Sequence, residues 1–335
     1  MAVNGKFSDE MVLKNMVYQG TVWGPTLWNV FYEDARQPVK ESGFTEVVYA
    51  DDLNAYQEEK QETSNEEALQ KATACQTALH TWGKANQVVF DSTKESFHVL
   101  SPKTPEGEDF RLLGIPFDCE LSMESAVREL AQEAGWKLRT LLKTSRFHND
   151  RKLVDLYKAK LLSYVEYRTA AVYHATNTVL KPLDGVQKRF LKALECTETE
   201  ALMEFNLAPL AARRDIAMLG VIHRTTLGKG PTHFQQFFPA AAKSNTSYLT
   251  RRAAKNHSRQ LEDPRKGAFP ELLRRSALGL IAVYNLLPES IVAEDTVKEF
   301  QKKLQELLKA RAEAGCEDWA DTLSPRVPLW RHSLR

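Results

Sequence analysis

Cysteine is scarce in this chain, and the few cysteines are far apart. Only Cys75, Cys119, Cys196 and Cys316 occur in 335 residues, and no two form a Cys-x-x-Cys pair. This spacing argues against a zinc knuckle and against a disulfide framework, and it is typical of proteins from a reducing compartment. We therefore expect an intracellular protein, in the cytoplasm, the nucleus or both.

Long apolar runs and targeting segments are also missing. No stretch approaches the ~18 apolar residues of a membrane-spanning helix, and the first residues lack the pattern of a signal peptide. No internal repeat or low-complexity tract is visible, and we expect no membrane partner. The composition, 43% hydrophobic and 27% charged, is that of a globular protein long enough for two or three domains.

The net charge of +1 conceals an uneven distribution along the chain. Residues 1–118 contain 10 basic and 19 acidic side chains, whereas residues 119–335 contain 35 basic and 25 acidic ones. Within the second part, residues 128–192 hold 14 basic against 6 acidic side chains. An acidic part that collects cations and a basic part that holds phosphates suit a nucleic-acid enzyme. Solvated helix faces are an equally good explanation of the charge split alone.

The motif Tyr49-Ala50-Asp51-Asp52 stands between two short apolar runs. Its β-branched and aromatic flanks favour strands, and aspartate favours the turn between them. Adjacent carboxylates at a hairpin tip need positive charge nearby, and hard divalent cations prefer such oxygen ligands. The sequence therefore predicts a hairpin that carries a metal site at Asp51 and Asp52.

A second motif precedes this hairpin. Residues 19–25 read Gln-Gly-Thr-Val-Trp-Gly-Pro, and Pro25 suits the first position of a helix over residues 26–35. A turn that leads into a buried helix, with Trp23, Leu27, Trp28 and Phe31 as core residues, is the simplest explanation of this segment. Upstream, the Asn4-Gly5 dipeptide predicts a hairpin, with a returning strand at residues 11–18.

The order of these two motifs resembles the palm of reverse transcriptases, most closely that of non-LTR (LINE-type) retrotransposons. The resemblance covers roughly residues 1–215. It implies that Asp51 and Asp52 are catalytic metal ligands for Mg²⁺, with Mn²⁺ as a possible substitute. It also implies that Gln19 and Gly20 lie beside the incoming nucleotide and the template.

Two further segments agree with the same resemblance. Ser64 and Glu67 form a capping-box pattern that begins a helix over residues 64–87, followed by strands at 88–90 and 97–100 around an Asp91–Lys94 turn. By resemblance, Lys94 is the general acid that assists the pyrophosphate leaving group, although a solvated turn lysine is at least as good an explanation. The segment 111–117 resembles the hairpin that grips the primer end, which gives Leu113 and Gly114 a substrate-binding role; an ordinary edge strand is the alternative.

From residue 122 onward the apolar spacing is helical. Helices are expected at 123–144, 150–174 and 179–195, with basic outer faces, and they resemble the thumb that clamps the product duplex through its phosphates. The expected phosphate contacts, any of which is also explained as an ordinary surface charge, are Lys137, Arg139, Lys143, Arg146, Arg151 and Lys152. Residues 200–335 read as further helices, with apolar stretches at 272–287 and 290–314 and a polar linker at 256–270.

These observations predict an α+β fold. We expect a partial reverse-transcriptase palm at residues 1–118, an antiparallel sheet with helices. A helical thumb at 119–200 and a helical C-terminal extension at 201–335 would follow. The implied activity is RNA-directed DNA synthesis from dNTPs on an RNA template with a DNA primer. The oligomeric state is not predicted.

One expected element is missing. The palm motif that carries a further aspartate lies upstream of the Gln-Gly segment in this family, and neither it nor the fingers are found in the first eighteen residues. Two-metal catalysis uses ions ~3.5–4 Å apart, and that aspartate would bridge them. We therefore expect an N-terminally truncated polymerase that is inactive or nearly inactive alone. The alternatives are a non-catalytic nucleic-acid-binding protein, a decayed retroelement remnant, or another reverse-transcriptase lineage.

Overall fold

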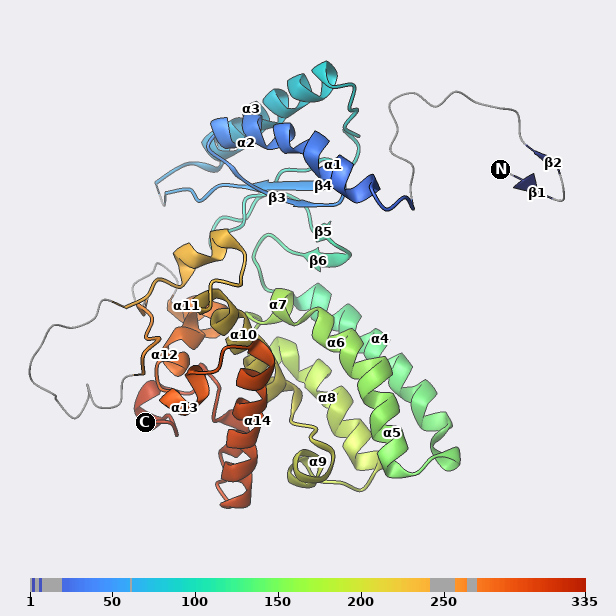
Figure 1. Cartoon of the computed structure of the whole chain (residues 1–335), viewed down its shortest axis with the longest axis vertical. Helices are drawn as coiled ribbons and strands as arrows, with labels where there is room; N and C mark the ends of the chain where they lie inside the picture. Colours follow the sequence, from blue (N-terminus) through green and yellow to red (C-terminus); the bar gives the residue numbers. More distant parts are fainter. Residues whose placement is uncertain (1, 4–5, 8–19, 61, 242–256, 264–269) are drawn as a thin grey trace, which may run out of the picture. The chain divides into compact units, whose positions relative to one another are not determined.

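The computed structural model describes residues 2–3, 6–7, 20–60, 62–241, 257–263 and 270–335. Gln19 and the returning strand expected at residues 11–18 lie outside this set. The chain divides into two compact units, Met1–Glu108 and Asp109–Arg335, which are described separately (Figure 1). Antiparallel hairpins are combined with many helices, so the predicted α+β class is confirmed at this level.

In its described residues, the first unit has two hairpins and three α-helices. β1 and β2 pair antiparallel with Val3 opposite Lys6, as the Asn4-Gly5 dipeptide predicts. β3 and β4 form the second hairpin, in which Tyr49 is opposite Asp52. The elements are β1 (Ala2–Val3), β2 (Lys6–Phe7), α1 (Gly24–Tyr32), η1 (Glu33–Ala35), α2 (Arg36–Glu41), β3 (Thr45–Tyr49), β4 (Asp52–Tyr56) and α3 (Asn65–Ala85).

The helix starts follow the predicted signals. Pro25 occupies the first turn of α1, where its missing N–H costs no intrahelical hydrogen bond. The Ser64 side chain accepts a hydrogen bond of 3.2 Å from the Glu67 N–H and so caps α3. An N-cap of this kind stabilises a helix by about 1 kcal/mol. Local sequence therefore determines where α1 and α3 begin.

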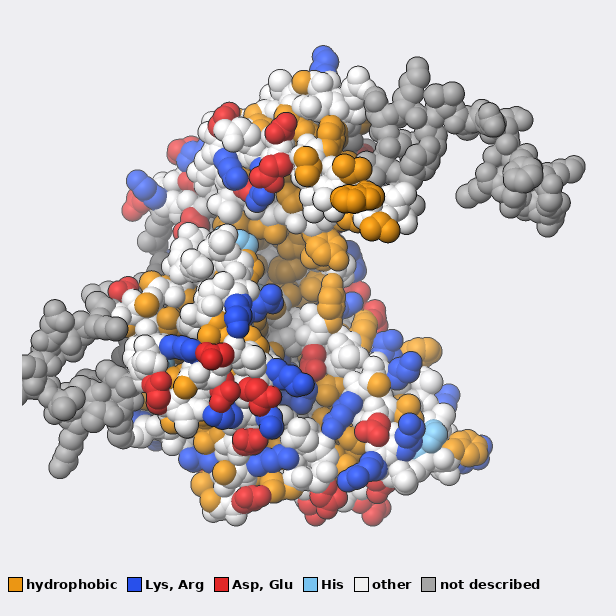
Figure 2. All heavy atoms as spheres, viewed as in Figure 1, with side chains coloured by type: hydrophobic (Ala, Val, Ile, Leu, Met, Phe, Trp, Pro, Cys, Tyr) orange, Lys and Arg blue, Asp and Glu red, His pale blue; other side chains and the backbone are white. Residues whose placement is uncertain are grey.

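The core of the first unit is small, and α1 contributes little to it. The buried residues are Tyr32, Ala35, Val39, Cys75 and Leu79. The expectation that Trp23, Leu27 and Phe31 are core residues is wrong, since 70%, 53% and 43% of these side chains are exposed. Figure 2 shows hydrophobic side chains at the surface where α1 lies. The sequence indicated a helix after Pro25 but not which of its apolar side chains are covered.

The strands expected at residues 88–90 and 97–100 do not form. Both segments run without a ladder, apart from one isolated antiparallel bridge between Val99 and Glu106. Val89 is 93% exposed. The segment is instead held against α3 by Glu95, which accepts hydrogen bonds from Gln76 and contacts His80 Nε2 at 2.8 Å. A strand needs a pairing partner as well as β propensity, and none of the described strands supplies one here.

The second unit starts with a short hairpin and continues as helices. β5 (Phe110–Leu112) and β6 (Ile115–Phe117) pair through the two-residue turn Leu113-Gly114. Helices cover the three segments that were expected to be helical, but the second expected helix, over residues 150–174, is not continuous, because the chain leaves the helix at Arg168. They are α4 (Glu124–Lys143) with η2 (Ser145–Phe147), then α5 (Asp150–Tyr157), the π-helical η3 (Lys158–Leu162) and α6 (Ser163–Tyr167), and, after α7 (Thr169–Val172), α8 (Asn177–Ala193).

Buried apolar side chains hold these helices together. Tyr157 and Phe190 stack with ring centroids 4.1 Å apart, and α4 packs along α8. Burial of each large side chain stabilises the fold by about 1.5–3 kcal/mol.

Asp118 accepts hydrogen bonds from backbone N–H groups just before α4. Its carboxylate accepts bonds of 2.7 Å from the N–H groups of Ser122 and Met123.

The rest of the second unit is a set of shorter helices around another apolar cluster. His223 lies at its centre, stacked on Phe300 at 3.9 Å and hydrogen-bonded to the Tyr284 hydroxyl. The elements are α9 (Glu198–Phe205), α10 (Leu210–Thr226), η4 (Thr232–Phe237), α11 (Pro270–Arg275), η6 (Ala277–Gly279), α12 (Leu280–Tyr284), α13 (Glu289–Val292), α14 (Val297–Glu313), η7 (Trp319–Asp321) and η8 (Leu329–Arg331).

Two expectations for this region need correction. The apolar stretch 272–287 is not one helix, because Ser276 caps η6 and the chain turns tightly at Gly279, where a Cβ would lie 2.0 Å from the Arg274 carbonyl oxygen. The segment 257–263, within the expected polar linker, is packed: His257 and Leu261 are buried, and Ser258 donates to Glu289. Its polar residues His257, Ser258 and Arg259 form hydrogen bonds with α12 and α13.

Hydrogen bonds and ion pairs connect α7 and α8 to the last part of the chain. Arg326 donates to the carbonyl oxygens of Tyr173 and Ala175, at 2.7 and 3.0 Å, and to Asn177 Oδ1. Arg214 of α10 forms a bidentate pair with Asp184 of α8.

Both expected domain boundaries, after residues 118 and 200, lie inside this unit. Within the described part of the chain, the helices are too short or too polar to span a bilayer.

Candidate functional site

The tip of the β3–β4 hairpin places both predicted carboxylates in solvent. Tyr49 and Asp52 are the last paired residues, so Ala50 and Asp51 form the two-residue turn between the strands. Asp51 and Asp52 are exposed, as a site that receives ligands requires. The predicted hairpin at this motif is confirmed.

Ala50 gives this turn its shape. Its φ is +55°, in the left-handed region where a side chain is disfavoured, and such a residue costs roughly 1–2 kcal/mol. A positive φ at the first turn position is what a tight hairpin needs, and glycine or asparagine normally supplies it. The strain persists because surrounding contacts hold the turn in place.

Trp28 of α1 supplies one of those contacts. Its indole Nε1 donates a hydrogen bond of 3.0 Å to the Ala50 carbonyl oxygen. The Trp28 ring stacks on Tyr32, with centroids 5.1 Å apart and planes 18° apart, and Tyr32 meets Trp82 of α3 edge-on. Burial first, and the negative charge of Asp51 second, raise the pKa of the Tyr32 phenol. The helix after the Gln-Gly segment therefore supports the turn that carries the carboxylates.

Sequence reasoning treated Trp28 only as a packing residue. The indole N–H could have indicated the contact, because a partly buried tryptophan normally donates this N–H to an acceptor. The motif order along the chain indicated that α1 and the hairpin belong together, but it did not identify the residue that joins them.

Among the residues that the structure describes, the two carboxylates have no acidic partner with which to form a metal-binding group. Within the described ranges, no group of three or more His, Cys, Asp or Glu side chains is arranged to hold a metal ion. The donor set is thus two exposed oxygen ligands. Mg²⁺ is often bound by one or two carboxylates together with substrate phosphates and water. Asp51 and Asp52 fit that incomplete type of site, and they do not form a closed protein cage.

Lys94 and Gly20 lie in the first unit with the carboxylates, but neither contacts them through a hydrogen bond or ion pair found in the structure. Lys94 ends the predicted turn and contacts Asp91, with Nζ and Oδ2 3.7 Å apart, and its side chain is 83% exposed. Gly20 is exposed with φ +85°, which favours glycine, and a Cβ there would meet nothing within 4 Å. Gly20 is therefore open to solvent on the side where a Cβ would lie.

Leu113 and Gly114 lie at the tip of the β5–β6 hairpin in the second unit. Both have positive φ, +49° and +77°, as a type I′ turn requires. Leucine is unusual at the first of these positions, and 44% of its side chain is exposed. Arg111 of the same hairpin pairs with Glu129 of α4 at 3.2 Å and so fixes the hairpin to the helix.

The six predicted cations of the second unit gather where α4, η2 and α5 meet. Lys137 lies 4.6 Å above the ring of Tyr164, and the Arg146 guanidinium lies 4.7 Å above the ring of Phe147. Among the ion pairs found in the described residues, none includes Lys137, Arg139, Lys143, Arg146, Arg151 or Lys152. Lys and Arg side chains gather over these helices in Figure 2. Their charges remain available to a polyanion.

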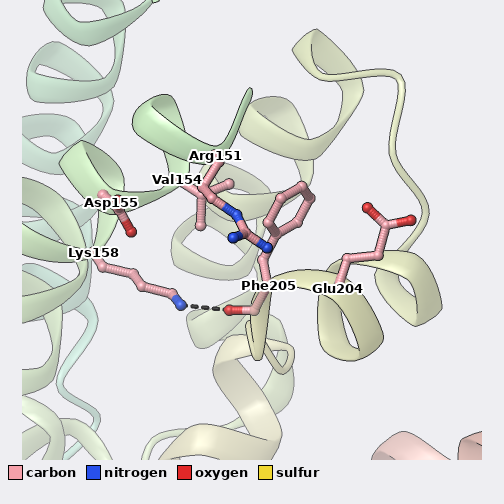
Figure 3. A pocket seen from close by; sticks show the side chains of 6 residues that line it. All are labelled: Arg151, Val154, Asp155, Lys158, Glu204 and Phe205. Carbon is pink, nitrogen blue, oxygen red and sulfur yellow. Dashed lines mark hydrogen bonds between the residues drawn. The ribbon is translucent and has the colours of Figure 1, made fainter. Parts of the chain in front are cut away.

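Arg151 also lines a cavity of about 350 Å³ between α5 and α9 (Figure 3). The guanidinium lies beside the ring of Phe205, and Lys158 of the π-helical turn donates to the Phe205 carbonyl oxygen. Burial first, and the nearby positive charge of Arg213 second, lower the pKa of Lys158. Asp155 and Glu204 line the same cavity, so it has no excess of positive charge.

The adjacent arginines Arg213 and Arg214 of α10 are structural. Arg213 pairs with Glu166 at 2.6 Å, and Arg214 is buried in its pair with Asp184. Both side chains are occupied by partners in the fold and are not available to a phosphate.

Comparison with known proteins adds no identification, because the chain matches no family model, no curated protein and no solved structure.

Proposed function

We propose that this chain is part of a reverse transcriptase, a metal-dependent enzyme that transfers nucleotides from dNTPs to a DNA primer on an RNA template. The observation that carries the proposal is the β3–β4 hairpin, which presents Asp51 and Asp52 to solvent on a turn held by Trp28. The palm-like order of sequence motifs supports the same assignment. In this proposal β3, β4, α1 and α3 belong to a polymerase palm and the α4–α8 bundle to its thumb.

The carboxylates would act through bound Mg²⁺. One ion would lower the pKa of the primer 3′-hydroxyl and another would stabilise the pyrophosphate that leaves. Asp51 and Asp52 would hold these ions together with the dNTP phosphates. Since no third acidic ligand accompanies them in the described ranges, we expect little or no polymerisation by this chain alone.

A primer-extension assay with Mg²⁺ or Mn²⁺ on a homopolymer template tests the catalytic part. We expect trace synthesis at most, and strong synthesis that disappears in Asp51→Asn would contradict the expectation of inactivity. Metal binding is tested separately by replacing Mg²⁺ with Fe²⁺ in the presence of a dNTP and ascorbate, which cleaves the backbone near a bound ion. Cleavage at residues 45–56 should occur in the wild type and disappear in Asp51→Asn.

Asp91→Asn is the matched control for the metal test. Asp91 is another aspartate of a turn in the same unit, but it contacts Lys94 and Thr93 instead of a second carboxylate. The Asp91 variant should retain cleavage at the hairpin. Absence of hairpin cleavage in the wild type would remove the support for a metal site at Asp51 and Asp52.

A non-catalytic nucleic-acid-binding protein is the second candidate. The six cations of α4, η2 and α5, which have no ion-pair partner among the described residues, favour it, because such cations bind phosphates without any chemistry at the hairpin. Binding that falls with salt and survives Asp51→Ala would support this candidate. Lys143→Ala should weaken binding and reduce the slope of log binding constant against log salt concentration by about one. Lys298→Ala, on the exposed side of α14, should change neither the affinity nor this slope.

A further inference from the structure

Two exposed aromatic side chains lie among the unpaired cations of the second unit. Trp136 on α4 is 62% exposed and Phe147 in η2 is 68% exposed. Apolar rings of this size are normally buried in a core. Neither belongs to the apolar cluster that holds the bundle together. Their exposure therefore needs an explanation other than packing.

The positions on α4 form one stripe. Trp136, Arg139 and Lys143 follow at spacings of three and four residues, which places them on the same helix face. All three are exposed, whereas the opposite face, with Leu130, Ala134 and other apolar residues, is buried. Seven residues of α-helix span about 10 Å. That length corresponds to about three nucleotides at the 3.4 Å rise of a stacked strand.

A cation and an exposed ring also lie together just beyond the end of α4, in η2. Arg146 lies over the ring of Phe147 at 4.7 Å, so this exposed ring carries a cation on one face. Unpaired nucleobases stack on aromatic rings while cations contact the phosphates, and this combination holds single strands with little sequence preference. A base-paired duplex hides the faces of its bases and offers mainly phosphates to such a surface.

We propose that Trp136 and Phe147 form a stacking platform for the unpaired bases of single-stranded nucleic acid, with Arg139, Lys143 and Arg146 on its phosphates. The inference rests on the proposed nucleic-acid binding of this unit and specifies a single strand as its ligand. A protein partner fits the stripe less well, because charged residues interrupt the aromatic ones at every helical turn and leave no continuous apolar patch.

The test compares two labelled ligands by fluorescence anisotropy, oligo(dT) and the matched dT·dA duplex, at one salt concentration. One stacked base contributes about 1–3 kcal/mol, which corresponds to about a 5- to 150-fold weaker binding of oligo(dT) by Trp136→Ala. Duplex binding should change less than twofold. Trp136→Phe should retain most of the affinity for oligo(dT), since a phenyl ring still stacks.

Trp330→Ala is the matched control. Trp330 is also exposed, at 67%, and carries Arg331 over its ring at 4.3 Å, but it lies in η8 away from the six cations in sequence. We expect this variant to bind both ligands as the wild type does. Circular dichroism checks that each variant is folded, and the exposure of both tryptophans makes unfolding an unexpected result.

The outcomes separate this inference from the proposed function. Equal losses for oligo(dT) and duplex, or no loss in Trp136→Ala, would overturn the platform while leaving nucleic-acid binding intact if Lys143→Ala still weakens it. A wild-type protein that binds neither ligand would overturn both. Trp136→Ala could also change the oligomeric state without any change in affinity for nucleic acid. That result would show that Trp136 makes a protein–protein contact, and it would also overturn the platform.

Discussion

The indole Nε1 of Trp28 donates a hydrogen bond to the Ala50 carbonyl oxygen at 3.0 Å, across 22 residues of sequence. The contact joins α1 to the turn that presents Asp51 and Asp52. The acceptor belongs to the strained residue of that turn, whose φ is +55°. The position of the carboxylates therefore depends on a side chain of a different element.

Trp28→Phe should loosen the hairpin tip. The phenyl ring retains the stack on Tyr32 but cannot donate to the Ala50 carbonyl oxygen, and the loss of one hydrogen bond costs on the order of 0.5–1.5 kcal/mol. We expect hydrogen exchange of the amides of residues 45–56 to become about 2- to 12-fold faster. Trp23→Phe is the control, because Trp23 is 70% exposed; an equal effect of both variants would show that the hydrogen bond is unimportant.

Ala50→Gly should have the opposite effect. Glycine adopts positive φ without the steric cost of a Cβ, although it loses more backbone entropy on folding. The net gain is about 0.5–1 kcal/mol, which predicts about 2- to 5-fold slower amide exchange in the hairpin. Ala55→Gly, in the middle of β4, should instead accelerate exchange. Faster exchange in Ala50→Gly would mean that the turn is not strained.

Arg326→Ala should destabilise the whole second unit. The guanidinium donates to the carbonyl oxygens of Tyr173 and Ala175 and to Asn177 Oδ1, and its removal leaves buried acceptors without partners. The expected cost is about 2–4 kcal/mol, measured by urea denaturation of the intact chain with far-UV circular dichroism. Arg331→Ala removes an exposed arginine of the same region and should cost less than about 0.5 kcal/mol.

The stability of the second unit should also depend on Asp215. This carboxyl group is fully buried, and burial raises its pKa from 3.8 to about 7 although Tyr173 donates a hydrogen bond to it at 2.6 Å. The folded state thus binds a proton more tightly than the unfolded chain. Stability from this group is present below pH 4 and is lost as the pH rises toward 7, by up to about 4 kcal/mol.

Asp215→Asn should remove that dependence, and the measurement is the difference between the urea midpoints of wild type and variant at several pH values. The difference is needed because His174, His223, His257 and His332 act in the opposite direction. Burial lowers the pKa of each of these imidazoles, so they reduce stability as the pH falls below 6.5. A constant difference between pH 4 and 7 would contradict the assignment of the raised pKa to Asp215.

Local signals in the sequence predicted much of the fold. The cap and turn residues located α3 and the β3–β4 hairpin, because each depends on a few neighbouring residues. The Leu113-Gly114 turn was expected only from the resemblance of residues 111–117 to a hairpin of a known family. The strands expected at 88–90 and 97–100 failed, since pairing depends on a distant partner that β propensity does not reveal.

The sequence indicated the aspartates of the candidate site but not the side chain that holds their turn in place. Adjacent aspartates in a hairpin turn are visible in sequence, whereas the Trp28 contact is set by how α1 packs on the unit. The cations of α4 were identified by charge, but Trp136 was not, because an apolar residue at helical spacing is normally assigned to the core. A core tryptophan and an exposed one can occupy the same helical spacing, and only the burial seen in the structure distinguishes them.

The contacts of Arg326 also constrain how the chain folds during synthesis. The bundle of α4 to α8 leaves the ribosome about 130 residues before Arg326 does, and domains generally fold as they emerge. Until then the carbonyl groups of Tyr173 and Ala175 lack this donor. A nascent chain that is stalled before Arg326 should therefore be more sensitive to protease around α7 than the released protein.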